Sequence, residues 1–212
     1  MTLPQILHQV WLGGPMPERL RRYTRTWLRH HPCWDYRLWR ERDIEPLLRN
    51  RAAYDAASSW SEKSDVARYE ILLRYGGIYA DTDFECLRSL DELLNGVNAF
   101  AGTPDGCHVA SNILGAVPGH PFLAACVEYL PARTARLRGA SPAHRTGPGL
   151  TTDIYHRLRR PGAPPPLTVF PRTCFHPYHY SEPHRRRERF PDAYAVHHWE
   201  GSWVRSWAPG SG

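Results

Sequence analysis

The residues best suited to chemistry are two aspartates that flank a single threonine. Asp81-Thr82-Asp83 follows the apolar run 78–80, which predicts a buried strand ending at the first carboxylate. Ligands of open α/β sheets bind at the carboxyl ends of strands, and Mg²⁺ and Mn²⁺ take oxygen ligands. The motif therefore predicts a divalent-metal site, although an isolated DxD also occurs in solvated turns.

A second charged pair comes just before this motif. Asp65 and Arg68 lie three positions apart in segment 61–75, whose apolar periodicity predicts a helix, with Ser61 or Ser64 as its cap. The spacing puts both side chains on one helix face. They can form an ordinary ion pair, or Asp65 can accept from sugar hydroxyls while Arg68 meets hydroxyls or phosphate.

The elements that must position these residues alternate along the chain. We expect strands over 5–12, 36–39, 78–80, 99–102 and 113–117, and helices over 17–31, 44–57, 61–75 and 121–137. Residues 160–166 contain four prolines and predict a rigid loop. Alternating strands and helices are typical of an α/β fold. We expect one domain over 1–212, with 171–212 as an irregular segment that closes over the active site.

Composition narrows the function classes. The 212 residues carry 27 Lys and Arg against 21 Asp and Glu, a formal net charge of +6, and Lys63 is the only lysine. An arginine-rich chain suits anionic partners, so nucleic acid, membrane surfaces and nucleotide-linked substrates all stay open. Five widely spaced cysteines without a CxxC pair predict a reducing, cytoplasmic location. We expect no signal peptide and no integral membrane segment.

Three segments together resemble the family 32 glycosyltransferases, which contain a DXD sugar-binding region. They are Ile6–Gly13, the continuous unit Ser64–Asp83, and His197-His198-Trp199-Glu200-Gly201-Ser202-Trp203. That family includes initiating α-mannosyltransferases and capsular polysaccharide enzymes. More distantly, the layout is similar to the glucosylating domains of clostridial toxins. The matches occur in the expected order and cover most of the chain.

The resemblance implies a GT-A fold, an α/β architecture with a Rossmann-like mixed central sheet flanked by helices. It also implies a nucleotide-diphosphate sugar donor, a divalent metal (Mn²⁺ or Mg²⁺) and retention of anomeric configuration. The implied metal ligands are Asp81, Asp83 and His197, with His198 in reserve. The implied donor-binding residues are Trp11, Asp65, Arg68, Tyr79, Asp81, Asn112, Ser202 and Trp203. The implied catalytic residues are Asp65, Arg68, Asp83 and Trp203.

Several of these residues have simpler explanations. Trp11 and Tyr79 can be packing residues, and Asn112 can belong to a turn. Trp203 can simply anchor the C-terminal segment. By resemblance, Gly147-Pro148-Gly149 is a loop near the acceptor side, whereas His120-Pro121 predicts a helix start.

The predicted function is transfer of a hexose from a nucleotide sugar to an acceptor hydroxyl by a same-face mechanism. A UDP-sugar is the first choice of donor and GDP-mannose the second. The acceptor is a small molecule, a glycan or a lipid-linked sugar, and we expect no nucleic-acid partner. The alternatives are a basic nucleic-acid-binding protein, based on the run 184–189, and a metal-dependent phosphohydrolase that uses both aspartates.

Overall fold

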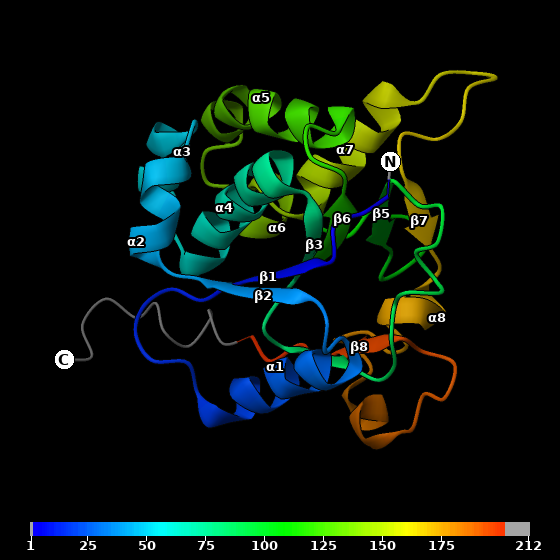
Figure 1. The fold of residues 1–212 in the computed structure, drawn as a ribbon. Coiled ribbons are helices and arrows are strands. Elements are labelled where there is room, and N and C mark those ends of the chain that lie inside the picture. The colour runs from blue at the N-terminus through cyan, green and yellow to red at the C-terminus, as the bar shows by residue number, and fades with distance from the viewer. Residues whose placement is uncertain (1, 202–212) are drawn as a thin grey trace.

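The computed structural model describes residues 2–201 and is organised around a mixed six-stranded sheet (Figure 1). Its strands lie in the order β2-β1-β3-β6-β5-β7. β1 is parallel to β2 and β3, and β5 is parallel to β7, whereas β6 is antiparallel to β3 and β5. The strands are β1 Ile6–Val10, β2 Asp35–Trp39, β3 Gly77–Ala80, β5 Ala99–Gly102, β6 Ile113–Ala116 and β7 Thr168–Phe170. A mixed central sheet is the predicted architecture, and it is confirmed.

Helices cover both faces of this sheet. Figure 1 shows α3, α4, α5 and α7 on one face, and α1 with α8 on the other. The helices are α1 Glu18–His30, α2 Glu41–Ile44, α3 Arg51–Asp55, α4 Trp60–Tyr75, α5 Pro121–Arg136, α6 Pro142–Arg145, α7 Pro148–Leu158 and α8 Arg172–Phe175, with 3-10 turns η1 Glu45–Leu47 and η2 Pro183–Arg187. Each face has its own apolar core, one including Val66, Tyr69 and Phe122 and the other Trp27 and Phe84.

A second, two-stranded sheet joins the middle of the chain to its end. β4 Phe84–Cys86 pairs antiparallel with β8 Ala195–His197, so that Phe84 lies opposite His197. The sequence pattern did not predict either strand. Because β4 starts directly after the DxD motif, this pairing carries the C-terminal segment to the same end of the molecule.

The turn between α4 and β3 explains why two glycines stand there. Gly76 and Gly77 have φ angles of 64° and 88°, which side chains disfavour. A Cβ on Gly76 would lie 2.5 Å from Cδ of Pro118, and one on Gly77 would lie 2.6 Å from the carbonyl oxygen of Ile6. The two glycines therefore let α4 turn directly into β3 beside β1.

Two local predictions are wrong. The helix expected over 44–57 is broken into α2, η1 and α3, because Pro46 lacks an amide donor and the Glu70 carboxylate binds the amides of Arg49 (3.1 Å) and Asn50 (2.9 Å). The cap of α4 is neither Ser61 nor Ser64 but Ser59, whose side chain accepts from the Glu62 amide.

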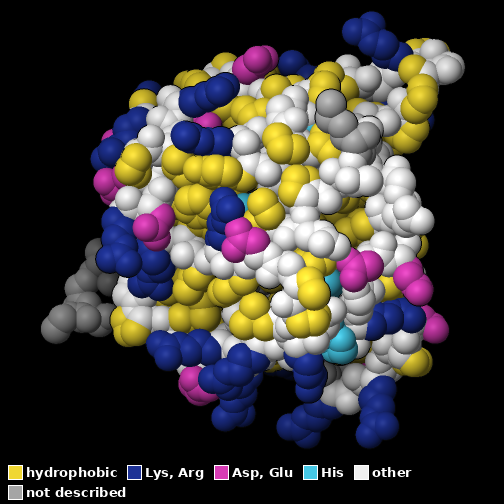
Figure 2. All heavy atoms as spheres, in the orientation of Figure 1, with side chains coloured by type: hydrophobic (Ala, Val, Ile, Leu, Met, Phe, Trp, Pro, Cys, Tyr) yellow, Lys and Arg dark blue, Asp and Glu magenta, His cyan; other side chains and the backbone are white. Residues whose placement is uncertain are grey.

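The positive charge lies largely on the surface. Along α1, arginine side chains point to solvent on the face opposite the buried Leu20 and Trp27. Figure 2 shows Lys and Arg side chains gathered along the lower edge of the molecule, where α1 lies in Figure 1. The exposed arginines of α1 are Arg19, Arg21, Arg22, Arg25 and Arg29. The positive charge of α1 is therefore largely exposed to solvent.

Candidate active site

A cavity of about 540 Å³ opens where β1 and β3 end and β6 begins. The end of β3 is tied to the start of β6 by a hydrogen bond from the Asp81 amide to the Asn112 carbonyl (2.9 Å). The cavity contains both predicted acidic motifs. Its polar and aromatic lining residues are Trp11, Trp60, Ser61, Ser64, Asp65, Arg68, Asp81, Thr82, Asp83, Ser111, Asn112, Tyr180, His197 and Trp199.

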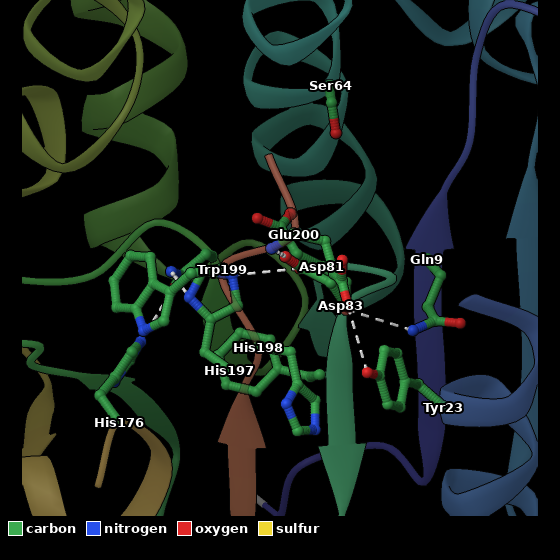
Figure 3. Close-up of polar contacts among 12 residues, drawn as sticks. Gln9, Tyr23, Ser64, Asp81, Asp83, His176, His197, His198, Trp199 and Glu200 are labelled. Carbon is green, nitrogen blue, oxygen red and sulfur yellow. Dashed lines mark hydrogen bonds and ion pairs between the residues drawn. The ribbon is translucent and has the colours of Figure 1, made fainter. Parts of the chain in front are cut away.

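Three potential metal ligands converge in this cavity (Figure 3). One carboxylate oxygen from each of Asp81 and Asp83 and one ring nitrogen of His197 lie within 4.8 Å of one another. Nε2 of His197 is 3.1 Å from Oδ1 of Asp83. His197 is positioned by β8, whereas Asp81 and Asp83 follow β3, so strand pairing brings the ligands together across the chain.

The two adjacent histidines face different carboxylates. His197 contacts Asp83, while Nε2 of His198 lies 2.8 Å from Glu85, and the His198 ring stacks on Tyr23 at 4.4 Å. Successive side chains of an extended segment point to opposite sides. The geometry therefore brings His197, rather than the reserve candidate His198, to the two aspartates.

Helix α4 contributes the second pair. The Arg68 guanidinium lies 3.0 Å from Asp65 and 2.9 Å from Asp81, and it donates to the Ser111 carbonyl at 2.8 Å. Asp65 also accepts from the hydroxyl of Thr146 at 2.7 Å. Arg68 is buried, so this is not a surface ion pair. It links the α4 carboxylate to the DxD motif.

The carboxylates have unequal proton affinities. Burial raises the pKa of Asp65 to about 6, against the opposing effects of Arg68 and Thr146. Burial also raises the pKa of Asp81, whereas His197 and the Glu200 amide hold the pKa of Asp83 below its usual range despite burial. Two of these carboxylates, Asp65 and Asp81, contact the Arg68 guanidinium, and Asp83 lies close to Asp81. When all three are ionised, they and the guanidinium together carry a net charge of −2, which matches a divalent cation.

A chain of hydrogen bonds orients His197 from behind. Nε2 of His176 lies 3.0 Å from Oδ1 of Asn112, and Nδ2 of Asn112 lies 3.2 Å from Nδ1 of His197. Burial keeps the pKa of His176 well below its usual value, so this ring stays neutral. These contacts fix the orientation of the His197 ring beside Asp83.

The C-terminal segment is anchored at Glu200. Its carboxylate, whose side chain is 3% exposed, lies 2.7 Å from Arg19 and also pairs with Arg186. It accepts from the Tyr23 hydroxyl at 3.2 Å, and its backbone amide donates to Oδ2 of Asp83 at 3.0 Å. The anchor thus binds α1 and η2 on one side and the DxD motif on the other.

The other predicted site residues are distributed unevenly. Trp11 lines the cavity at the end of β1, and its indole N–H donates to the Gly14 carbonyl (3.1 Å). Tyr79 lies behind the lining: its side chain is fully buried, and its hydroxyl donates to Asp81 at 2.7 Å. Ser202 and Trp203 lie outside the described residues. The expected loop at 147–149 lines the cavity with Gly147 and Pro148, but Pro148 begins α7.

Several cavity residues were not predicted as site residues. Trp60 precedes the expected helix start, and Trp199 was noted only as part of the terminal motif. Thr146, which binds Asp65 but does not line the cavity, directly precedes the expected loop at 147–149. Tyr180 belongs to the irregular segment after residue 170, where no periodicity points to a site. An aromatic residue in a segment rich in His and Pro was the only signal that the sequence offered.

The fold and the DxD cavity define a glycosyltransferase architecture of the GT-A type. The structure is similar to that of PaToxG glycosyltransferase, with a TM-score of 0.62, 13% identity, and coverage of 74% of this chain and 70% of that one. Residues 17–100 match the family described as "Glycosyltransferase sugar-binding region containing DXD motif". The resemblance to DXD glycosyltransferases noted from the motifs is therefore confirmed over these residues.

Relatives of known name are similar over part of their length. The chain is 34% identical over 166 residues to inositol phosphoceramide mannosyltransferase 3 of Schizosaccharomyces pombe, covering 75% of this chain and 46% of that protein. It is 32% identical over 133 residues to mannosyl phosphorylinositol ceramide synthase CSH1 of Saccharomyces cerevisiae, covering 60% and 35%. The chain thus spans less than half of these relatives. Within residues 2–201, no helix is long and apolar enough to cross a membrane.

Proposed function

We propose that the protein is a metal-dependent, retaining glycosyltransferase that moves a hexose from a nucleotide-diphosphate sugar to an acceptor hydroxyl. The observation that carries this proposal is the convergence of Asp81, Asp83 and His197 beside the Asp65–Arg68 pair in one cavity. Such a cavity offers ligands for a cation, a guanidinium near developing phosphate charge, and carboxylates for sugar hydroxyls.

The donor set fits a divalent cation. Two carboxylates and one imidazole suit Mn²⁺, which accepts both oxygen and nitrogen ligands, better than Mg²⁺, which prefers oxygen alone. Asp81, Asp83 and His197 would hold the cation. When bound, it would neutralise negative charge on the diphosphate leaving group.

The chain's own residues support the remaining steps. Trp11 provides a ring for the nucleobase at the end of β1, and the carboxylate of Asp65 can accept from donor-sugar hydroxyls. In the reaction the acceptor oxygen forms a bond to the anomeric carbon as the bond from that carbon to the diphosphate oxygen breaks. The electron pair stays with the diphosphate, and the acceptor proton passes to a phosphate oxygen.

The alternative to same-face attack is a double displacement, which needs an enzyme carboxylate as nucleophile, and Asp65 and Glu200 are the two candidates for that role. Asp65 is held by Arg68 at 3.0 Å and Thr146 at 2.7 Å, with its pKa raised by burial to about 6. The Glu200 carboxylate is bound to Arg19, Arg186 and Tyr23. Neither arrangement favours a double displacement through an enzyme carboxylate.

The relatives change the order of donors. By their names, one of the two relatives transfers mannose and the other is a synthase of a mannosyl lipid. This favours a mannose donor such as GDP-mannose over the UDP-sugar that was the first choice of donor. The cytoplasmic location and the nature of the acceptor stay predictions. So does closure of segment 171–212 over the site.

The binding-protein alternative loses its main support. Within the basic run, Arg185 pairs with Glu188 at 3.0 Å and Arg186 with Glu200, so part of its charge is used inside the fold. No comparable observation favours a phosphohydrolase.

The deciding experiment combines binding with turnover. In Mn²⁺, a panel of GDP-mannose, UDP-glucose, UDP-galactose and UDP-N-acetylglucosamine should contain one donor that raises the melting temperature, because a ligand bound only by the native state stabilises it. That donor should give a glycoside whose first-formed anomer, followed by NMR, retains the donor configuration. Inversion would overturn the retaining mechanism, and free sugar without any glycoside would favour a hydrolase. Salt-sensitive retention of RNA without turnover would favour a binding protein.

A further inference from the structure

Two aromatic side chains at the cavity have no role in the site described above. Tyr180 is 66% exposed, the highest value among the large hydrophobic side chains that the structure describes as exposed, and it lines the cavity. Its ring centroid lies 5.7 Å from that of Trp199. Trp199 in turn lies 4.1 Å from the ring of His197. The rings thus lead from the proposed metal ligands toward the solvent.

The backbone at Trp199 is unusual. Its φ of 52° is the one positive value outside glycine among the described residues, and such a conformation is disfavoured for a bulky side chain. Strained residues of this kind persist where the surrounding structure holds them, often at functional sites. Here the indole N–H donates to the Tyr178 carbonyl at 3.1 Å, which fixes the plane of the ring.

Sheet order separates these rings from the proposed nucleoside side. Trp11 follows β1, Asp81 follows β3, and Asn112 precedes β6, so they succeed one another along the order β1-β3-β6. The Trp199 ring lies 5.9 Å from that of His176, which in turn is hydrogen-bonded to Asn112. In Figure 3, Trp199 and His176 lie on one side of Asp83, and Gln9 of β1 lies on the other. A donor with its base at Trp11 and its diphosphate at the aspartates leaves the Trp199 side for the acceptor.

We propose that Tyr180 and Trp199 form an acceptor subsite that binds the apolar face of a six-membered polyol ring, a pyranose or a cyclitol. This inference rests on the proposed glycosyltransferase function for its name as an acceptor site. A six-membered polyol ring presents axial C–H groups on one face and hydroxyls around its rim, so that face packs on an aromatic ring while the hydroxyls stay free to react. Apart from each other, the aromatic rings of Tyr180 and Trp199 contact the imidazoles of His176, His179 and His197.

Tyr180 is the better residue to change because its exposure keeps the fold independent of it. With the full chain, the donor that is turned over and methyl α-D-mannopyranoside or myo-inositol as the acceptor, Tyr180→Ala should raise the acceptor KM about tenfold, the loss of roughly one stacked ring. The donor KM and acceptor-free donor hydrolysis should stay within twofold. Tyr180→Phe keeps the ring and should match the parent. Leu28→Ala, a 41% exposed residue on α1, is the matched control.

A binding measurement keeps the subsite separate from the proposed activity. Saturation-transfer NMR with methyl α-D-mannopyranoside and myo-inositol, without donor, should show transfer to ring C–H protons of at least one probe. Tyr180→Ala should strongly reduce that transfer and Tyr180→Phe should retain it. An unchanged acceptor KM in Tyr180→Ala, a raised donor KM instead, or no transfer from either probe to the parent would overturn the subsite. Tyr180-dependent transfer in a protein that turns over no nucleotide sugar would retain the subsite and refute the proposed transferase.

Discussion

The backbone amide of Glu200 donates a hydrogen bond of 3.0 Å to the carboxylate of Asp83, 117 positions earlier in the chain. The other end of Glu200 is its buried carboxylate, which pairs with Arg19 at 2.7 Å and with Arg186. One residue therefore ties the second aspartate of the DxD motif to two surface arginines. Glu200 acts on the proposed metal site through Asp83 and is a positioning residue.

Replacing Glu200 should weaken metal binding more than it weakens the fold. Glu200→Ala releases Arg19 and Arg186, which are about half exposed and can regain water, but it loosens the segment that presents its amide to Asp83. Loss of a group that orients metal ligands typically lowers affinity 10- to 100-fold, so we expect the Kd for Mn²⁺ to rise about tenfold by calorimetry. Glu188→Ala, an exposed partner of Arg185, is the control. A lowered melting temperature with unchanged Mn²⁺ affinity would mean a purely structural role.

Asp83 itself should be required for donor turnover but not for folding. An asparagine can still accept from the Glu200 amide through its one carbonyl oxygen, so the melting temperature should change by no more than a few degrees. Loss of the negative charge should remove Mn²⁺ binding and lower kcat by at least about 100-fold. Asp105→Asn, at an exposed carboxylate bound to His108, should behave like the parent. Turnover of Asp83→Asn at the parental rate would show that the metal is held elsewhere.

Local signals explain what the sequence could predict. Apolar runs mark β1, β3 and α4 in the sequence. The two glycines at 76–77 mark the turn between α4 and β3, which only small residues can make. Asp65, Arg68 and Asp81 come from these well-defined elements. Their meeting in one cavity therefore follows from short-range patterns together with the rule that ligands bind at strand ends.

Other features depend on contacts between distant residues. The pairing of β4 with β8 joins three-residue strands more than a hundred positions apart, and three residues show no periodicity. The break in the expected helix 44–57 depends on Glu70, which binds the amides of Arg49 and Asn50 from another element. Trp199 adopts a positive φ that no propensity would assign to tryptophan. Tertiary hydrogen bonds decide each of these cases.

Arg68 should tolerate lysine but not alanine. Its guanidinium is 4% exposed and lies between Asp65 and Asp81, so alanine would leave the buried Asp65 and the partly exposed Asp81 without their cation. Breaking a buried pair in this way costs about 3–5 kcal/mol, and we expect Arg68→Ala to unfold in urea at markedly lower concentration. Lysine keeps the charge but cannot bridge both carboxylates and the Ser111 carbonyl, so Arg68→Lys should fold and raise the donor KM about tenfold or more.

The control for this substitution is Arg25→Lys, because Arg25 pairs with Glu18 on the exposed face of α1. It should leave both stability and donor KM unchanged, since exposed pairs contribute at most about 1 kcal/mol. A donor KM for Arg68→Lys equal to that of the parent would mean that Arg68 serves the fold alone.

Stability should fall in mildly acidic solution because of a buried histidine outside the site. Nε2 of His8 donates to the Gly76 carbonyl (2.9 Å) and Nδ1 accepts from Trp39 (3.0 Å), while burial lowers the pKa of His8 to about 4 from 6.5. Between these values the unfolded chain binds more protons than the native one, so the free energy of unfolding decreases as pH falls. Over the roughly 1.5 pH units from 6.5 to 5, the free energy of unfolding should decrease by about 2 kcal/mol through His8. Asp65, whose raised pKa acts in the opposite direction, is the same in both proteins. Between pH 7.5 and 5.0, urea unfolding should therefore show a loss of stability that is about 2 kcal/mol larger in the parent than in His8→Gln, with the exposed His108→Gln as control. Since His31 and His176 are the same in both proteins, an identical pH dependence for the parent and His8→Gln would refute the assignment.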